Sequence, residues 1–243
     1  MSNETEYSEG GSPIYRHPER NEWQTPQAEP SEICLEQISE HIERHLGPVK
    51  TVFHELVSDT VHIDVHIVLP TEQSPWIRLV TSGMSDLPMQ IPAESGASRY
   101  AELIMTLPPE WELEQEQFED ENWYWPIRLI KTLARLPHLY STWLGFGHTV
   151  PNGDPAQNYA PNTQLNGAII LPSITVPQDF HRLSISPDKE IAFFSVVPLY
   201  EEEMNLKLKK GTDHLLDLFD QHGMSDVINP QRKNIAKKRF FFF

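Results

Sequence analysis

Apolar residues recur every four positions in the segment SEICLEQISEHIERHLGP, at Cys34, Ile38, Ile42 and Leu46. This spacing puts the four side chains on one face of a helix. Ser31 suits the N-cap, Glu32 suits the first turn, and Gly47–Pro48 stops the helix. The pattern therefore predicts an amphipathic helix over residues 31–46.

Short segments rich in β-branched residues follow, at 51–57, 61–69 and 77–83. The linkers SDT and PTEQSP are short enough to join neighbouring antiparallel strands. RYAELIMTL at 99–107 is expected to add a fourth strand, although its alternation of apolar and polar residues is imperfect. Together these segments predict a largely antiparallel sheet.

The second half of the chain alternates between helical and extended patterns. A helix is expected in WPIRLIKTLARLP, with Pro126 in its first turn and Pro137 at its end. Residues 143–176 are rich in Gly, Pro and Asn, which indicates strands broken by long loops. DFHRLSI at 179–185 and EIAFFSVV at 190–197 read as a strand pair around the turn SPDK, and Pro198 is expected to close the second strand.

The last apolar stripe predicts a helix from Glu201 to about His222. Gly211 lies inside it, where glycine costs about 1 kcal/mol relative to alanine, so the helix either continues or breaks there. No segment repeats, and no linker divides the chain after residue 30. We therefore expect residues 1–30 to be a flexible leader and residues 31–243 to be one α+β domain, a mixed, largely antiparallel sheet packed by helices.

Composition and charge narrow the class of protein. The chain has 243 residues, 39% of them apolar, and carries 35 acids against 19 bases for a net charge of −16. An acidic surface repels nucleic acid and attracts a basic partner. No apolar run is long enough to span a membrane and the N-terminal residues lack a signal-peptide core, so we expect a cytoplasmic protein.

Two unusual segments leave alternatives open. The run EWELEQEQFEDE at 110–121 carries seven acids and is either a docking patch for a cationic partner or a solvated face. The four phenylalanines Phe240–Phe243 either form an edge strand, dock on a partner, mediate self-association or fray. The pattern does not determine the oligomeric state.

A metal site is the first chemical candidate, because His62, Asp64 and His66 alternate along a predicted strand and share one face. The two histidines would lie roughly 13 Å apart at about 3.3 Å per residue, too far to hold one ion at about 2.1 Å. A distant ligand, such as His54, His148 or His181, would be needed. We therefore favour a strand whose polar face is partly open to water over a metal site.

Other catalytic chemistry has weaker support in the sequence. Ser82 and Ser85 are the best placed serines, but neither lies in a GxSxG motif and no histidine is near them in sequence. No phosphate-binding glycine motif occurs, and the single cysteine, Cys34, excludes an internal disulfide and a multi-cysteine zinc site. We expect neither a cofactor nor enzymatic activity.

The segment LVTSGMSDLPM at 79–89 predicts a shaped turn that presents Met84 and Asp86. It resembles the Suppressor of fused family, specifically its bacterial single-domain members. The other matching stretches, in the family's order between residues 51 and 234, are HIDVHIVLPT, the YAEL of 100–103 leading to Leu107–Pro108 and Trp111, WPIRLIKTLARLPH, GHTVPNG at 147–153, FFSVVPLYEEE and RKN at 232–234.

The resemblance implies a mixed sheet packed by helices and no known catalytic activity. Animal members of the family grip a short transcription-factor peptide between two domains, and this chain looks like only the first of those domains. Bacterial members are thought to be immunity proteins that bind and neutralise toxins, which fits an acidic protein with a basic toxin domain as partner. The alternative is a metal-assisted hydrolase that uses His62, Asp64 and His66.

On this reading the partner binds at polar corners between matched strands. The candidate partner-binding residues are Asp86, Glu102, His148, Glu201, Glu202 and Glu203.

Overall fold

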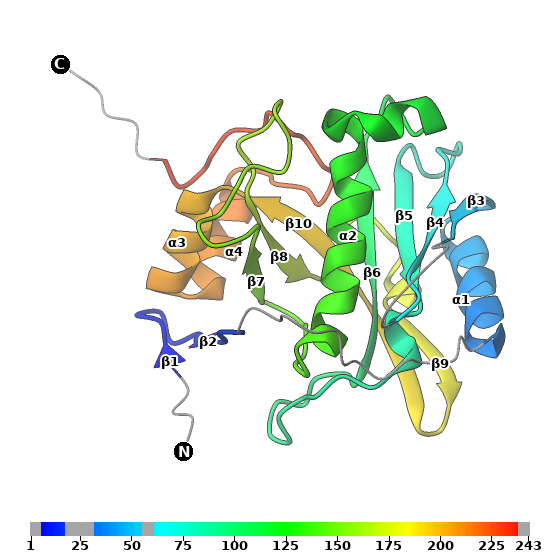
Figure 1. Cartoon of the computed structure of the whole chain (residues 1–243), viewed down its shortest axis with the longest axis horizontal. Coiled ribbons are helices and arrows are strands. Elements are labelled where there is room, and N and C mark those ends of the chain that lie inside the picture. The colour runs from blue at the N-terminus through cyan, green and yellow to red at the C-terminus, as the bar shows by residue number, and fades with distance from the viewer. Residues whose placement is uncertain (1–5, 18–31, 55–60, 238–243) are drawn as a thin grey trace.

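The computed structural model describes residues 6–17, 32–54 and 61–237 (Figure 1). Within these residues, one large sheet is flanked by helices. The helices are α1 (Glu32–His45), α2 (Glu121–Leu139), α3 (Glu201–Lys210) and α4 (Thr212–Gln221), with 3₁₀ turns η1 (Met84–Asp86), η2 (Gln115–Glu119) and η3 (Gln178–His181). The strands of the large sheet are β3 (Val49–Phe53), β4 (Asp64–Val68), β5 (Ile77–Ser82), β6 (Tyr100–Leu107), β7 (Thr149–Pro151), β8 (Gly167–Leu171), β9 (Arg182–Ser186) and β10 (Lys189–Leu199).

The strand order in the sheet is β3-β4-β5-β6-β10-β8-β7, and β9 also pairs with β10. All neighbours are antiparallel except β6 and β10, which run parallel with Tyr100 opposite Ile191. The sheet therefore consists of two antiparallel halves joined by one central parallel pair. This confirms the predicted α+β class and the mixed, largely antiparallel sheet in a single domain.

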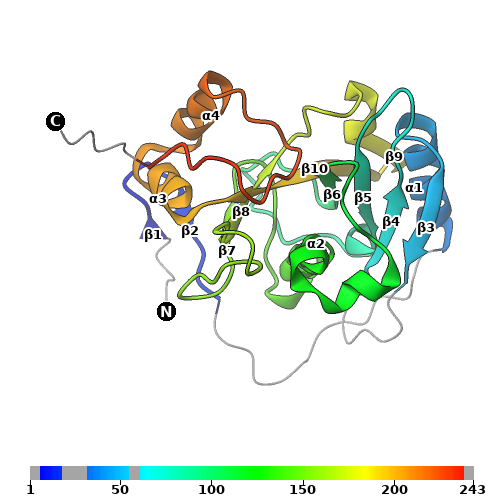
Figure 2. The same cartoon turned by 90° about the horizontal axis from the view of Figure 1, so that it is seen from above.

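Helices cover both faces of the sheet, with α2 on one side and α1, α3 and α4 on the other (Figure 2). Alternate strand residues supply the two cores, because side chains along a strand point to opposite faces. Val65 and Leu103 pack with Ile130 of α2 in the largest apolar cluster. On the other face, Ile38 and Ile42 of α1 pack in a second cluster, and helices α3 and α4 cover a third.

A line of buried polar side chains separates the second and third clusters. It contains Arg78 of β5, Thr106 of β6 and Ser195 of β10, each with at most 1% of its surface exposed, together with Asp226. Arg78 donates to the Thr106 hydroxyl at 2.5 Å, and the Ser195 hydroxyl donates to the Asp226 carboxylate at 3.3 Å. We call these four residues the polar seam.

Most predicted elements are confirmed, but the boundaries of α2 were predicted wrongly. The helix begins at Glu121, five residues before Pro126, and continues past Pro137 to Leu139. Asp120 caps it by accepting the amide of Asn122 at 2.9 Å. The missing amides of the two prolines are tolerated because this helix packs a long apolar face on the sheet, which outweighs the lost hydrogen bonds.

Two strand ends also differ from the prediction. Residues 178–181 form η3, so β9 begins at Arg182, and β10 runs through Pro198 to Leu199. The Leu199 carbonyl faces β8 and accepts from Asn166, so the nitrogen and carbonyl of Pro198 point to the other side. A proline is compatible with the strand there because no ladder hydrogen bond needs its amide.

At the C-terminal side, the helical stripe breaks at Gly211, whose φ of +90° a side chain would resist. Of the two alternatives that the sequence left open, the broken helix is therefore the one observed, as α3 and α4. The predicted helix over 31–46 is confirmed as α1, whereas its Ser31 cap and the Phe240–Phe243 segment lie outside the described residues. No helix in the described ranges is long and apolar enough to cross a bilayer.

Part of the predicted leader has secondary structure. β1 (Glu6–Tyr7) and β2 (Pro13–Ile14) form a small hairpin, and the Gly10 amide donates to the Leu208 carbonyl at 2.8 Å. A Cβ on Gly10 would lie 2.4 Å from the Gly211 nitrogen, so the hairpin approaches the α3–α4 junction as closely as two glycines allow. Residues 1–5 and 18–31 of the leader lie outside the described residues.

Candidate partner-binding site

The segment SGMSDL forms a tight corner where β5 leaves the sheet. Gly83 has a φ of +102°, and a Cβ on it would lie 1.9 Å from the His62 carbonyl oxygen. The next three residues form η1, with Met84 and Ser85 fully buried and Asp86 half-buried. The chain therefore turns through a conformation that glycine adopts readily and other residues resist, and this turn brings Asp86 to the surface.

Glu102 of β6 anchors this corner through hydrogen bonds to its carboxylate. Its carboxylate accepts the Ser85 amide at 2.9 Å, the Ser85 hydroxyl at 2.6 Å and the Thr81 hydroxyl at 2.6 Å. The side chain has 0% of its surface exposed, and this burial raises the pKa of Glu102 to about 7 despite the three donors. Glu102, predicted as a partner contact, therefore has internal hydrogen-bond partners and offers no surface of its own.

The C-terminal end of α2 also contacts the corner, through His138. His138 lies within hydrogen-bond distance of the Met84 carbonyl, at 2.7 Å, and burial lowers the pKa of this histidine. A neutral imidazole with its Nε2 protonated satisfies the carbonyl without burying a charge. The corner is thus tied to two elements far from it in sequence, and Asp86 is presented on a rigid support.

Replacing Glu102 by Gln is expected to remove a pH dependence of stability. A carboxyl whose pKa is raised on folding contributes most to the free energy of unfolding when the pH is below its unfolded pKa, near 4.5. This contribution falls by about 3 kcal/mol as the pH rises to about 7. Urea unfolding of both proteins at pH 5 and pH 8 measures it. Glu102→Gln should be close to the parent at pH 5 and more stable by about 2–3 kcal/mol at pH 8. If the difference in stability between Glu102→Gln and the parent were the same at pH 5 and pH 8, a buried, titrating Glu102 would be contradicted.

The sheet separates Asp86 from Glu201–Glu203. Asp86 follows the end of β5, whereas Glu201–Glu203 follow the end of β10. Because β5 is antiparallel to β6 and β6 is parallel to β10, these two ends lie on opposite sides of the sheet. The His148 carbonyl accepts the Ile170 amide, and Ile170 lies opposite Val196 in the C-terminal half of β10. His148 therefore lies between the two ends of the sheet.

A backbone hydrogen bond links the Asp86 corner to the segment that leads to His148. The Gln90 amide donates to the Thr142 carbonyl at 3.0 Å, which joins the Asp86 corner to the segment before β7. The ring of His148 packs edge-on against Trp143 with centroids 4.1 Å apart. Burial, with a smaller effect of Lys207, lowers the pKa of His148 to about 4, so this half-buried histidine is neutral at pH 7.

At the opposite end, Glu203 is fully buried and forms an ion pair with Arg232. Arg232 also donates to the Pro198 carbonyl at 2.9 Å, and the Glu203 carboxylate accepts the Tyr200 and Ile235 amides at 3.0 and 3.1 Å. Beside them, Asn234 donates to Glu202 at 2.7 Å, and Glu201 and Glu202 are exposed. Glu203 is therefore an internal anchor for the RKN segment, and only the two other acids offer surface.

The polar face of the HIDVH strand is open to water at His62, whose side chain is 32% exposed, and closed at Asp64 and His66, which are 5% and 1% exposed. This face lies on the α1 side of the sheet, where Val68 of the same strand packs in the α1 cluster. Asp64 bonds to His54 at 2.8 Å and to His62 at 3.1 Å. Within the described ranges no group of three or more His, Cys, Asp or Glu residues is arranged to hold a metal ion.

His66 instead lies 2.9 Å from the hydroxyl of Ser82 on the neighbouring strand. The sequence offered no sign of this pair, since the two residues are adjacent only through the β4–β5 register. Burial lowers the pKa of His66 to about 4, and its Nδ1 has no carboxylate partner among the described residues. A catalytic triad needs such a carboxylate to orient the histidine, so this pair lacks the third member.

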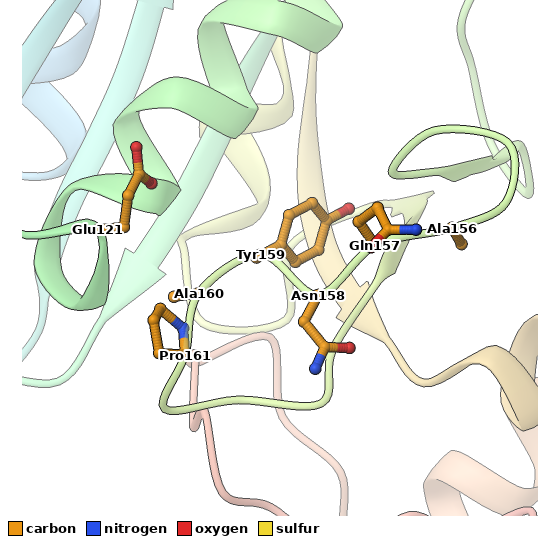
Figure 3. A pocket seen from close by; sticks show the side chains of 7 residues that line it. All are labelled: Glu121, Ala156, Gln157, Asn158, Tyr159, Ala160 and Pro161. Atoms are coloured by element: carbon orange, nitrogen blue, oxygen red, sulfur yellow. The ribbon is translucent and has the colours of Figure 1, made fainter.

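A shallow hollow of about 470 Å³ lies near the start of α2 (Figure 3). Glu121 faces the loop 156–161 across it, and Arg128 ties the two by donating to the Tyr159 carbonyl at 2.9 Å. None of the six candidate partner-binding residues lines this hollow, although Glu121 is the last residue of the acidic run 110–121. The Tyr159 ring stacks on Trp125 at 5.2 Å, which makes it part of the core.

Fold and site together define a class: a single α+β domain in which a clamped corner presents an acidic side chain at one end of a mixed sheet. A family model described as Suppressor of fused protein (SUFU) matches residues 59–233. The chain belongs to the Suppressor of fused family. A search of curated protein sequences gives no match.

Solved structures share the fold. A protein described as a Suppressor of fused homolog from Neisseria gonorrhoeae superposes with a TM-score of 0.60 at 15% identity, covering 86% of this chain and 97% of the other. The Sufu–Fu complex crystal structure gives a TM-score of 0.56 at 13% identity, covering 83% and 92%. At these identities the likeness concerns the fold.

Proposed function

We propose that this protein is a non-catalytic binding module that holds a protein partner at the Asp86 corner and the adjoining segment that leads to His148. The observation that carries the proposal is the corner itself: Glu102 and His138 fix the two residues just before Asp86, Ser85 and Met84. A side chain on a fixed backbone loses little entropy on binding. Family membership supports the proposal, as does a structural relative that was solved as a complex with the protein Fu.

The partner that fits best is a basic protein, and within the family we propose a toxin domain that this protein neutralises in the cytoplasm. With a net charge of −16, the protein attracts a cationic partner over long range and speeds their association. Glu201 and Glu202 form a second acidic surface at the opposite end of the sheet. A partner that contacts both ends must span the domain, so the two surfaces can be tested separately.

Capture from the native cell at low salt, followed by calorimetric titration of the recovered protein, tests the proposal. Asp86→Lys should weaken binding by about 10- to 100-fold, equivalent to about 1.4–2.7 kcal/mol. Glu40→Lys is the matched control, because it makes the same charge change at an exposed site on α1. It should weaken binding only about two- to threefold through the reduced long-range attraction.

Equal losses in the two variants would show that net charge, and not the corner, determines binding. Recovery of no protein at low salt would count against a binding module altogether. Metal analysis of the protein purified without chelator addresses the hydrolase alternative, since one equivalent of tightly held metal would favour it.

A further inference from the structure

A groove of about 750 Å³ lies on the α1 face of the sheet, away from the Asp86 corner. Its walls are the end of α1 at 43–48, the turn at 71–76 and the segment 174–177. This volume is within the range of ligand sites in proteins, about 300–1,000 Å³. None of the residues discussed for partner binding lines it.

Arg78 of the polar seam lines this groove and is 1% exposed. Its guanidinium donates to the hydroxyl and the carbonyl of Thr175, both at 2.6 Å, and to the hydroxyls of Thr106 and Ser74. All these acceptors are neutral, and the buried Nε has no partner. In the described part of the chain no carboxylate forms an ion pair with Arg78. The cation is therefore buried without a direct ion pair, which is costly unless a carboxylate supplies one.

The hydrogen bonds of Arg78 have a structural purpose, since they hold segment 174–177 on the sheet. They do not account for the charge or for the unpartnered Nε. Asp226 is the acid whose charge acts on Arg78, but its own Oδ2 accepts the hydroxyls of Ser173 and Ser195. Burial lowers the pKa of Arg78 only to about 10, so it is charged at pH 7.

The remaining groove residues favour an anion beside an apolar group. Arg44 and His45 line the groove together with one acid, Glu43. At the rim, Ile174 is 70% exposed and Trp76 is half-buried. This is a cationic groove with an apolar rim in a protein whose net charge is −16.

We propose that this groove binds an extended peptide segment of a protein partner through one carboxylate side chain, placed on Arg78, and a neighbouring aliphatic side chain, placed on Ile174 and Trp76. The occupant carries a single acid, because the net charge of the protein repels a polyanion. The inference goes beyond the proposed function, since it concerns another face and an acidic segment instead of a basic toxin.

The probe is an array of acetylated, amidated hexapeptides, each with one Asp or Glu beside Leu, Ile or Val, and the same peptides with Asn or Gln. The full chain should bind at least one acidic peptide ten times more tightly than its amide counterpart. Ile174→Glu should abolish this preference, and because Ile174 is exposed the variant is expected to fold. Arg44→Gln, the control at the rim, should change affinity about two- to threefold.

Arg78→Lys should also lose the preference, but this substitution at a buried position also changes the stability of the fold. The Nε–Hε NMR signal of Arg78 in the unmodified protein supplies an independent readout. It should shift on saturation with the acidic peptide and not with its amide counterpart. Equal affinities for the two peptide sets, an acetate affinity equal to that of the peptides, or an unmoved Nε–Hε signal would each overturn the proposal.

Discussion

Gly83→Ala is expected to destabilise the protein by about 3–5 kcal/mol, at the upper end of the range for single substitutions. Two effects add. The φ of +102° costs a side chain about 1–2 kcal/mol, and the new methyl group would lie 1.9 Å from the His62 carbonyl oxygen. That oxygen belongs to the backbone beside β4 and cannot move without disturbing the strand. Urea unfolding at constant pH measures the loss.

Gly96→Ala separates the two effects. Gly96 also has a positive φ, +61°, but no other atom lies within 4 Å of the site of a Cβ. This variant should lose only the conformational cost, about 1–2 kcal/mol. If Gly83→Ala were no more destabilising than Gly96→Ala, the close approach of the corner to His62 would be refuted.

Arg232→Met is expected to cost about 3–5 kcal/mol, because it leaves the fully buried carboxylate of Glu203 without its cation. The double variant Arg232→Met/Glu203→Met should recover part of this loss, since an apolar pair leaves no buried charge. Urea unfolding of the two single variants and the double variant completes a cycle that isolates the interaction between the side chains.

Arg182→Met is the matched control for the ion pair. Arg182 and Glu190 also form an ion pair, but their side chains are 65% and 46% exposed. An exposed pair contributes about 0–1 kcal/mol, so this variant should unfold at nearly the same urea concentration as the parent. A similar loss in both arginine variants would mean that the C-terminal segment is not anchored through Glu203.

Elements whose signals are local could be predicted from sequence. The period-four apolar positions of α1 and the β-branched segments of the first four strands of the large sheet needed no distant partner to be recognised. The start of α2 was missed because Pro126 looked like a first-turn residue, whereas packing of the apolar face extends the helix back to Asp120. Tertiary packing overrode the local proline signal there.

The long-range hydrogen bonds and the ion pair that hold the candidate residues in place could not be predicted in this way. Glu102 meets Ser85 across neighbouring strands, His138 meets Met84 across 54 positions, and Arg232 meets Glu203 across 29. Each of these residues lay in a stretch that resembled the family, so the stretches were recognised but not their pairing. The same holds for Asp64 and His66 of the HIDVH strand, whose burial could not be predicted because nothing local in the sequence indicates what covers them.

The single parallel pairing in the sheet has a consequence for the order in which the protein acquires its structure. Strands β3 to β6 pair with neighbours in sequence and can assemble soon after synthesis, whereas β6 must wait for β10, with 91 positions between the partners Tyr100 and Ile191. Closing so long a loop is slow compared with forming a hairpin. Until β10 leaves the ribosome, the nascent chain exposes the free edge of β6, where aggregation can begin. Chaperone dependence during expression should therefore fall once Leu199 has emerged from the ribosome.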